Sequence, residues 1–88
     1  MSAFTAVGMR FRGNHVFSSG DSIVLQEDDN NPHDVNAVKI LVVGENSLTH
    51  VAYASRHDCL RLRAAMTGGR RRAYLIAGSP MSARLCLS

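Results

Sequence analysis

The sequence predicts a small, mainly β domain with one helix, folded as a partly open β-barrel of six strands in the order β-β-β-β-α-β-β. Short apolar runs alternate with turn residues along the chain, and one segment spaces its apolar residues as a helix does. The chain has 88 residues, of which 45% are hydrophobic and 19% are charged, enough for one globular core and too few for two. We therefore expect residues 1–88 to form a single domain.

Two strands are expected in the first third of the chain. The first covers Ala3–Phe11, where apolar and β-prone residues lead to a turn at Gly13-Asn14. A loop follows over His15–Gly20. The short apolar run Ser22–Gln26 predicts the second strand, which ends at the segment EDDNNPHD because Asn, Asp and Pro favour turns.

The middle of the chain predicts a β-hairpin at the centre of the sheet. Asn36–Val43 is strand-like and stops at the turn residues Gly44-Glu45-Asn46. Thr49–Ala54 alternates in polarity and is expected to pair with it.

A short amphipathic helix is expected next. Ser55 is placed to cap its N-terminus, and one buried stripe is predicted at Cys59, Leu62 and Met66. Gly68-Gly69 would end the helix in a left-handed conformation. The opposite side of the helix is expected to project two side chains towards solvent, Arg61 and Arg63.

Two more strands are predicted after the helix. They cover Arg72–Ala77 and Ala83–Leu87, and a turn at Gly78-Ser79-Pro80 separates them.

The charges are distributed unevenly along the chain. The net charge is +3 overall, and nine of the ten basic residues are arginine. The first fifty residues carry three basic and six acidic residues, whereas the remainder carries seven arginines against the single acid Asp58. Arginine suits phosphate and base recognition, so an anionic polymer such as nucleic acid is the expected partner. A secondary basic patch is expected at Arg61, Arg70, Arg71 and Arg72, mainly as a solvated surface that adds long-range attraction.

Several other classes of protein are not supported by the sequence. The two cysteines, Cys59 and Cys86, are expected as buried thiols rather than as a disulfide framework. Four histidines (His15, His33, His50 and His57) offer one close pair with a cysteine, His57-x-Cys59, so we expect no metal site and no cofactor. No catalytic motif is present, and we expect a binding protein rather than an enzyme. No apolar run is long enough for a membrane span, so we expect a soluble intracellular protein, nuclear or cytoplasmic according to its source.

Three segments of the chain resemble a known family. The segments AVGMRFRG, SIVLQEDDNNPHDVNAVKILV and THVAYASRHD occur in the order found in the HIRAN domain, which stands at the N-terminus of some Swi/Snf-type helicases and occurs as a stand-alone bacterial protein. The resemblance covers about Thr5 to Tyr74. Its most specific part is Asn31–Val38, which is similar to the family pattern Asn-Pro-x-Asp-x-Asn-Ala-Val.

The resemblance implies an OB- or SH3-like barrel that captures the 3′ end of single-stranded DNA between the first strand and the Asn-Pro loop. It implies that Arg10 contacts a backbone phosphate and that Phe11 stacks on the terminal base, with His33 on the other side of that base. Asp34 would accept a hydrogen bond from the terminal hydroxyl.

The remaining site residues are implied in the same way. Arg56 would hold a second phosphate, and Tyr53 would flank it. Arg12 completes the expected surface, at a position where the family often has an aromatic residue, and Ala52 stands where the family usually has glycine.

Structural roles remain open for part of this set. Asp34 and Asn36 lie in a Pro-containing loop, where side-chain hydrogen bonds to the backbone are the usual role of both residue types. Phe11 ends an apolar run and could be a core residue, although Arg10 and Arg12 beside it favour the surface.

Two functions are compatible with the sequence. The first is a module that binds single-stranded DNA, or its 3′ end, and targets a helicase or other repair or replication enzyme. The alternative is a protein-interaction or homodimerisation module that pairs through an exposed strand edge and does not bind nucleic acid.

Overall fold

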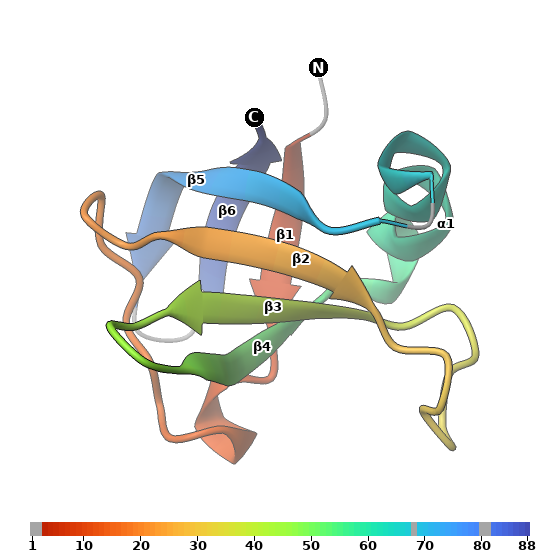
Figure 1. Cartoon of the computed structure of the whole chain (residues 1–88), viewed down its shortest axis with the longest axis horizontal. Helices are drawn as coiled ribbons and strands as arrows, with labels where there is room; N and C mark the ends of the chain where they lie inside the picture. Colours follow the sequence, from red (N-terminus) through yellow and green to blue (C-terminus); the bar gives the residue numbers. More distant parts are fainter. Residues whose placement is uncertain (1–2, 68, 80–81) are drawn as a thin grey trace.

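The structure, a computed structural model, describes residues 3–67, 69–79 and 82–88 (Figure 1). These residues form β1 (Ala3–Val7), η1 (Met9–Phe11), β2 (Ile23–Glu27), β3 (Val38–Val43), β4 (Leu48–Ala54), α1 (Arg56–Met66), β5 (Arg71–Ser79) and β6 (Ser82–Leu87). The predicted order of strands and helix is therefore confirmed.

The strands form a closed antiparallel barrel in the order β1-β4-β3-β2-β5-β6. Figure 1 shows β2, β3 and β5 crossing in front of β1 and β6, with α1 at one end. The barrel closes because β6 pairs on one side with β1 (Phe4 opposite Leu85) and on the other with β5 (Leu75 opposite Leu85). The sequence predicted a partly open barrel; the barrel is instead closed, and each described strand has a neighbour on both sides, although β1 and β4 pair only at Ala6–Ala54 and Val7–Tyr53.

Alternate residues of the strands fill the barrel. Its most deeply buried large side chains include Phe4, Leu25, Ile40 and Leu85, and α1 adds the predicted stripe, Cys59, Leu62 and Met66. Cys59 and Cys86 are buried free thiols, as expected. The Ser55 hydroxyl accepts a hydrogen bond from the His57 backbone N–H at 3.3 Å, which confirms the predicted cap.

The first strand is shorter than predicted. It ends at Val7, because Gly8 adopts a left-handed conformation (φ 79°) and the chain then turns through η1. The backbone N–H groups of Phe11 and Arg12 donate to the carbonyls of Gly8 and Met9, at 3.1 and 2.9 Å. Phe11 is consequently 75% exposed, so the core role left open for it is wrong.

A β-bulge shapes the surface of β4. Ile40 of β3 lies opposite Ala52, but Leu41, the next residue, lies opposite His50. Val51 is the extra residue, so Val51 and Ala52 are both buried. His50 and Tyr53 remain at the surface, where their rings meet edge to face with 4.6 Å between centroids.

The connections around β5 also differ from the prediction. The left-handed residue at the end of α1 is Thr67 (φ 52°) rather than a glycine, and Gly68 lies outside the described residues. β5 continues through Gly78 and Ser79, which were expected in a turn, and Pro80 lies outside the described residues. Within the described ranges, no helix has the length and apolarity to cross a membrane.

We predict that Leu62→Ala lowers the free energy of unfolding by about 2–5 kcal/mol, because the truncation leaves a cavity where α1 packs on the barrel. Leu60→Ala, on the same helix but 68% exposed, should change it by less than about 0.5 kcal/mol. Urea denaturation of both variants measures this. Similar losses for the two would contradict the packing of α1 described above.

Candidate nucleic-acid interface

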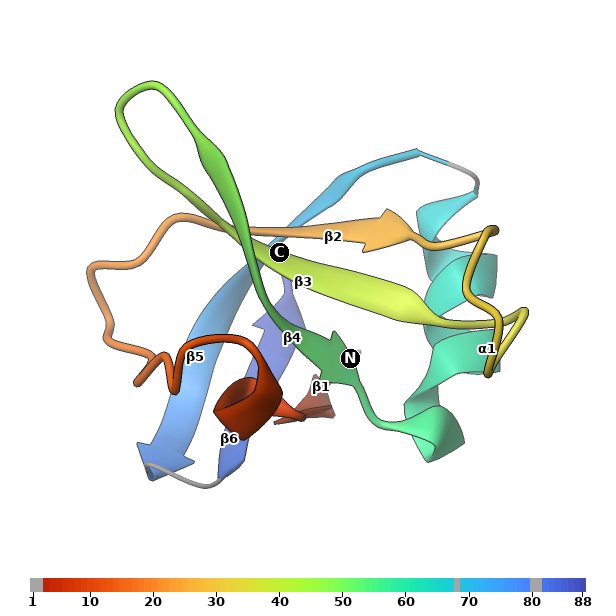
Figure 2. The same cartoon turned by 90° about the horizontal axis from the view of Figure 1, so that it is seen from below.

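A surface hollow of about 320 Å³ lies at the end of β4. Figure 2 shows this end of β4 between η1 and the loop that joins β2 to β3. The residues lining the hollow are Arg12, Asn31, His33, Asp34, Ala37, Tyr53, Ala54 and Arg56. The structure thus brings together five of the seven predicted site residues.

The other two predicted residues, Arg10 and Phe11, lie beside the hollow on η1. The Arg10 guanidinium carbon is 4.7 Å from the centre of the Phe11 ring, and that of Arg12 is 5.8 Å from the centre of the Tyr53 ring. Each is within the range of a cation–π contact. The rim therefore combines exposed cations with aromatic faces.

Asn31 organises the loop and was not predicted as a site residue. Its side-chain oxygen accepts from the backbone N–H groups of His33 (2.8 Å) and Asp34 (3.0 Å). Its amide nitrogen donates to the Tyr53 hydroxyl at 3.3 Å and to Asp28 at 3.4 Å. An Asn before Pro in a turn is a known signal for such bonds, but the sequence does not show that Tyr53 is the distant partner.

The two carboxylate oxygens of Asp34 contact different partners. One oxygen accepts from the Asn36 backbone N–H at 2.9 Å, the local bond that the sequence left open. The other lies 3.7 Å from the Arg56 Nε. Arg56 also donates to the His33 carbonyl at 3.0 Å, which fixes a carboxylate and a guanidinium side by side on the wall of the hollow.

Arg63 was predicted to project into solvent, and this is wrong. Its side chain is only 17% exposed and pairs with Glu27 at 2.8 Å and with Asp29 at 2.9 Å. It also donates to the carbonyls of Asn36 and Ala37, each at 2.9 Å. One guanidinium thus joins α1 to both ends of the β2–β3 loop.

The helical spacing contained a signal for this role. Arg63 follows buried Cys59 by four residues and precedes buried Met66 by three, so it flanks the buried stripe instead of opposing it.

The other predicted basic residues do not form one patch. Arg61 pairs with Asp58 at 2.7 Å and donates to the Ala3 carbonyl. Arg71 donates to the Ala65 and Ser88 carbonyls. Arg70 and Arg72 are both exposed, Arg72 on β5 and Arg70 in the residue before it.

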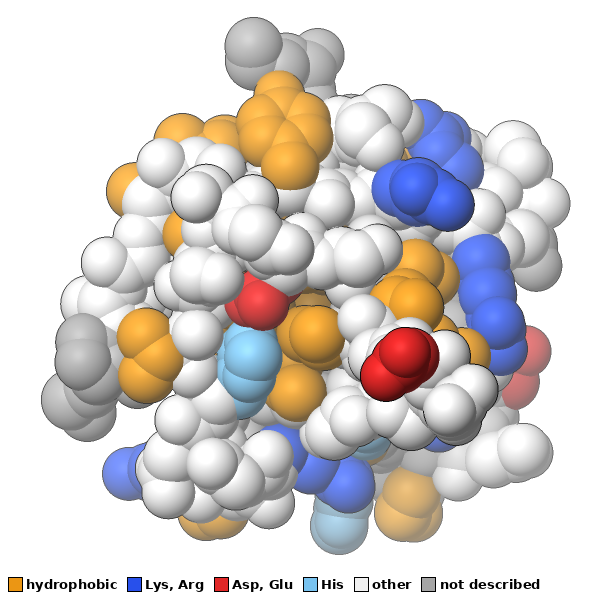
Figure 3. Space-filling model, turned by 60° about the vertical axis from the view of Figure 1, so that its left-hand side comes forward, with side chains coloured by type: hydrophobic (Ala, Val, Ile, Leu, Met, Phe, Trp, Pro, Cys, Tyr) orange, Lys and Arg blue, Asp and Glu red, His pale blue; other side chains and the backbone are white. Residues whose placement is uncertain are grey.

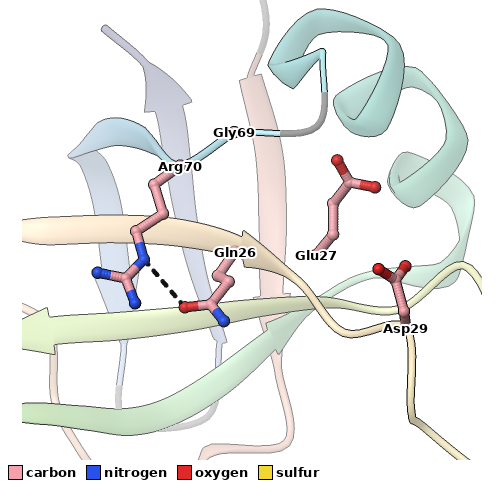
Figure 4. Close-up of a pocket in the computed structure, with 5 residues that line it drawn as sticks. All are labelled: Gln26, Glu27, Asp29, Gly69 and Arg70. Carbon is pink, nitrogen blue, oxygen red and sulfur yellow. Dashed lines mark hydrogen bonds between the residues drawn. The ribbon is translucent and has the colours of Figure 1, made fainter.

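A second hollow, of about 330 Å³, carries both signs of charge. Gln26, Glu27, Asp29, Gly69 and Arg70 line it. Figure 4 shows Glu27 and Asp29 together on the α1 side, whereas Arg70 extends the other way and donates to Gln26 at 3.1 Å. The two carboxylates make this hollow unsuitable for a phosphate.

His50 reports the electrostatics of the surface next to the site. Its partial burial lowers the pKa of the imidazole, and the cations of Arg12 and Lys39 lower it further. The hydrogen bond to the Ala52 carbonyl at 2.9 Å and the nearby Asp28 carboxylate oppose this effect. Among the described residues, no three His, Cys, Asp or Glu side chains are grouped so that they could hold a metal ion.

Comparison with known proteins gives one match. The family model of the HIRAN domain matches residues 1–71, which include every residue that lines the first hollow. No curated protein and no solved structure matches the chain.

We predict that Arg63→Ala lowers the free energy of unfolding by roughly 2–4 kcal/mol, because it leaves two carboxylates and two carbonyls without their donor. Arg61→Ala, which breaks an exposed pair on the same helix, should cost less than about 1 kcal/mol. Denaturation measures both. In Arg63→Ala, but not in Arg61→Ala, amide hydrogen exchange at His33 and Asp34 should become faster relative to exchange in β2. Unchanged exchange at these two residues in Arg63→Ala would contradict the role of Arg63 in holding the loop.

Proposed function

This chain belongs to the HIRAN domain family, a family of nucleic-acid-binding domains, and we propose that it binds single-stranded DNA by taking the 3′-hydroxyl end into the hollow beside β4. It would act as a binding module without catalysis of its own, bringing a helicase or another repair or replication enzyme to its substrate.

The observation that carries this proposal is the Asp34–Arg56 pair, with 3.7 Å between carboxylate oxygen and guanidinium nitrogen. A carboxylate ordinarily repels the phosphates of a nucleic acid. At a 3′ end, however, a hydroxyl replaces the next phosphate and can donate to Asp34, while the preceding phosphate accepts from Arg56. An internal nucleotide would bring a phosphate against Asp34, so the pair favours an end over an internal site.

Aromatic and basic side chains at the rim supply the rest of the affinity. Phe11 and His33 are both exposed, on η1 and on the β2–β3 loop, so each ring is available to a base. A base stacked on an aromatic ring contributes about 1–3 kcal/mol and tolerates any base. Arg10 and Arg12 add cations for the phosphates next to the stacked base.

The alternative function has weaker support. Pairing with a partner by β-augmentation needs an exposed strand edge, and in the described residues each strand has neighbours on both sides and open edges remain only along parts of strands, such as Leu48–Ala52 of β4.

We predict that the protein binds a labelled oligonucleotide ending in a 3′ hydroxyl at least about tenfold more tightly than one ending in a 3′ phosphate, the range of a charged hydrogen bond. Asp34→Asn should remove this preference, because it removes the charge and keeps an oxygen for the Asn36 N–H. Fluorescence anisotropy gives both affinities.

Glu45→Gln is the matched control, since Glu45 is an exposed acid in the β3–β4 turn, and it should keep the preference. Equal affinity of the wild-type protein for the two ends would refute end capture.

We predict that Phe11→Ala weakens oligonucleotide binding about 5- to 150-fold, the loss of one stacked base. Its thermal stability should not change, because the Phe11 ring is 75% exposed. Leu60→Ala, which truncates a similarly exposed apolar side chain on α1, should bind as the wild type does. If Phe11→Ala binds the oligonucleotide with wild-type affinity, Phe11 is not part of the binding site.

A further inference from the structure

The outward side chains of β4, β3, β2 and the start of β5 form a surface continuous with the hollow. In one row across the strands, Tyr53 lies opposite Lys39 and Lys39 opposite Gln26, and Gln26 accepts the Arg70 hydrogen bond. The next row runs from His50 through Leu41 and Val24 to Arg72. We call these eight residues the outer-sheet face. Tyr53 belongs to the outer-sheet face and also lines the hollow, so the two surfaces share a boundary.

The outer-sheet face is mainly basic, with one acid at its edge, Asp28, which accepts from the Tyr53 hydroxyl at 3.4 Å. Glu27 is the single acidic residue in these four strands, and it pairs with Arg63 of α1. Lys39, Arg70 and Arg72 remain, and Arg12 stands at the boundary with the hollow. In the view of Figure 3, this side of the molecule lies on the right, where basic side chains lie next to hydrophobic ones. Burial is the larger cause of the lowered pKa of His50 here, and Arg12 and Lys39 both act to lower it further.

The middle of the outer-sheet face is apolar and aromatic. Leu41 is only 8% exposed although it lies outside the barrel core, so it packs under its neighbours. The edge-to-face rings of His50 and Tyr53 lie beside it, separated from Arg72 by Val24. Stacking surfaces interleaved with cations are what a single strand needs along its course.

We infer that the single strand whose end lies in the hollow continues across the outer-sheet face, with Lys39 and Arg72 holding phosphates and with His50 and Tyr53 contacting bases. This inference rests on the proposed function. Three strand spacings separate β4 from β5, about 14 Å. Barrels of the OB type contact about 4–16 nucleotides, whereas a hollow of about 320 Å³ is at the small end of ligand sites and takes only the end of a strand.

The test compares two oligonucleotides with 3′ hydroxyl ends, one of three nucleotides for the hollow alone and one of ten. The wild-type protein should bind the longer one more tightly. In Lys39→Gln/Arg72→Gln, the ratio of the two affinities at 50 mM salt should fall about tenfold or more. The slope of log affinity against log salt concentration for the longer oligonucleotide should become shallower by about 1.4, or 0.7 for each lost phosphate contact. Affinity for the trinucleotide should stay within about twofold of the wild type.

Arg84→Gln is the matched control, because it removes an exposed arginine on β6 that contacts Thr5 of β1, on another side of the barrel. It should keep the affinity for both oligonucleotides. A second readout is the NMR chemical shift of the His50 ring protons, which should change when the ten-nucleotide strand binds, because a base then contacts the ring, and not when the trinucleotide binds.

The outcomes separate this inference from the proposed function. If the trinucleotide binds with a 3′-hydroxyl preference but the longer strand binds no more tightly, the proposed capture of the strand end in the hollow is supported. The outer-sheet face is then not used, and this inference is wrong. A loss of binding free energy in Arg84→Gln as large as half that in the double variant would also overturn the inference, because net charge alone would then explain both. If neither oligonucleotide binds the wild-type protein, the proposed function fails and this inference fails with it.

Discussion

The Arg63 guanidinium is the contact on which the site depends. A charged group that is largely out of water destabilises a protein unless it is paired and hydrogen-bonded. Arg63 meets this condition through two carboxylates before the β2–β3 loop and two carbonyls after it. Because α1 is fixed to the barrel by its buried stripe, the same contact fixes the loop that carries His33 and Asp34. The position of the hollow therefore follows from the packing of the helix.

The same kind of pairing explains why the surface is more basic than a net charge of +3 suggests. Four of the seven acidic residues form ion pairs with arginines, namely Glu27, Asp29, Asp34 and Asp58, and Asp21 is hydrogen-bonded to the His15 imidazole at 2.9 Å. Several of these acids also accept backbone N–H groups, as Asp58 does from Thr5 at 3.0 Å. The acidic N-terminal half is thus largely neutralised within the fold. The exposed arginines of the outer-sheet face and of η1 remain to attract a polyanion.

The bulge in β4 connects the core to this surface. Without the extra residue, strict alternation would place only every second side chain of β4 inside the barrel. Because Val51 and Ala52 are both buried, His50 and Tyr53 share one side and touch. Tyr53 also receives the Asn31 amide, which ties the loop to the strand. A one-residue irregularity therefore supplies both the aromatic pair and the anchor of the Asn-Pro loop.

The sequence by itself determined the features whose signals are local: the order of strands and helix along the chain, the Ser55 cap and the buried stripe of α1. It also indicated the family through the Asn31–Val38 motif, and the family model confirmed this. These features depend on residues within a few positions of one another. Only the tertiary structure decided that β6 closes the barrel, that β1 stops at Gly8, and that Arg63 turns to the loop. Each of these depends on which distant segments become neighbours, for Arg63 on carboxylates 34 and 36 residues away. Periodicity fixes which face of an element is buried, but the partner of a polar side chain at the margin of that face is set by long-range packing.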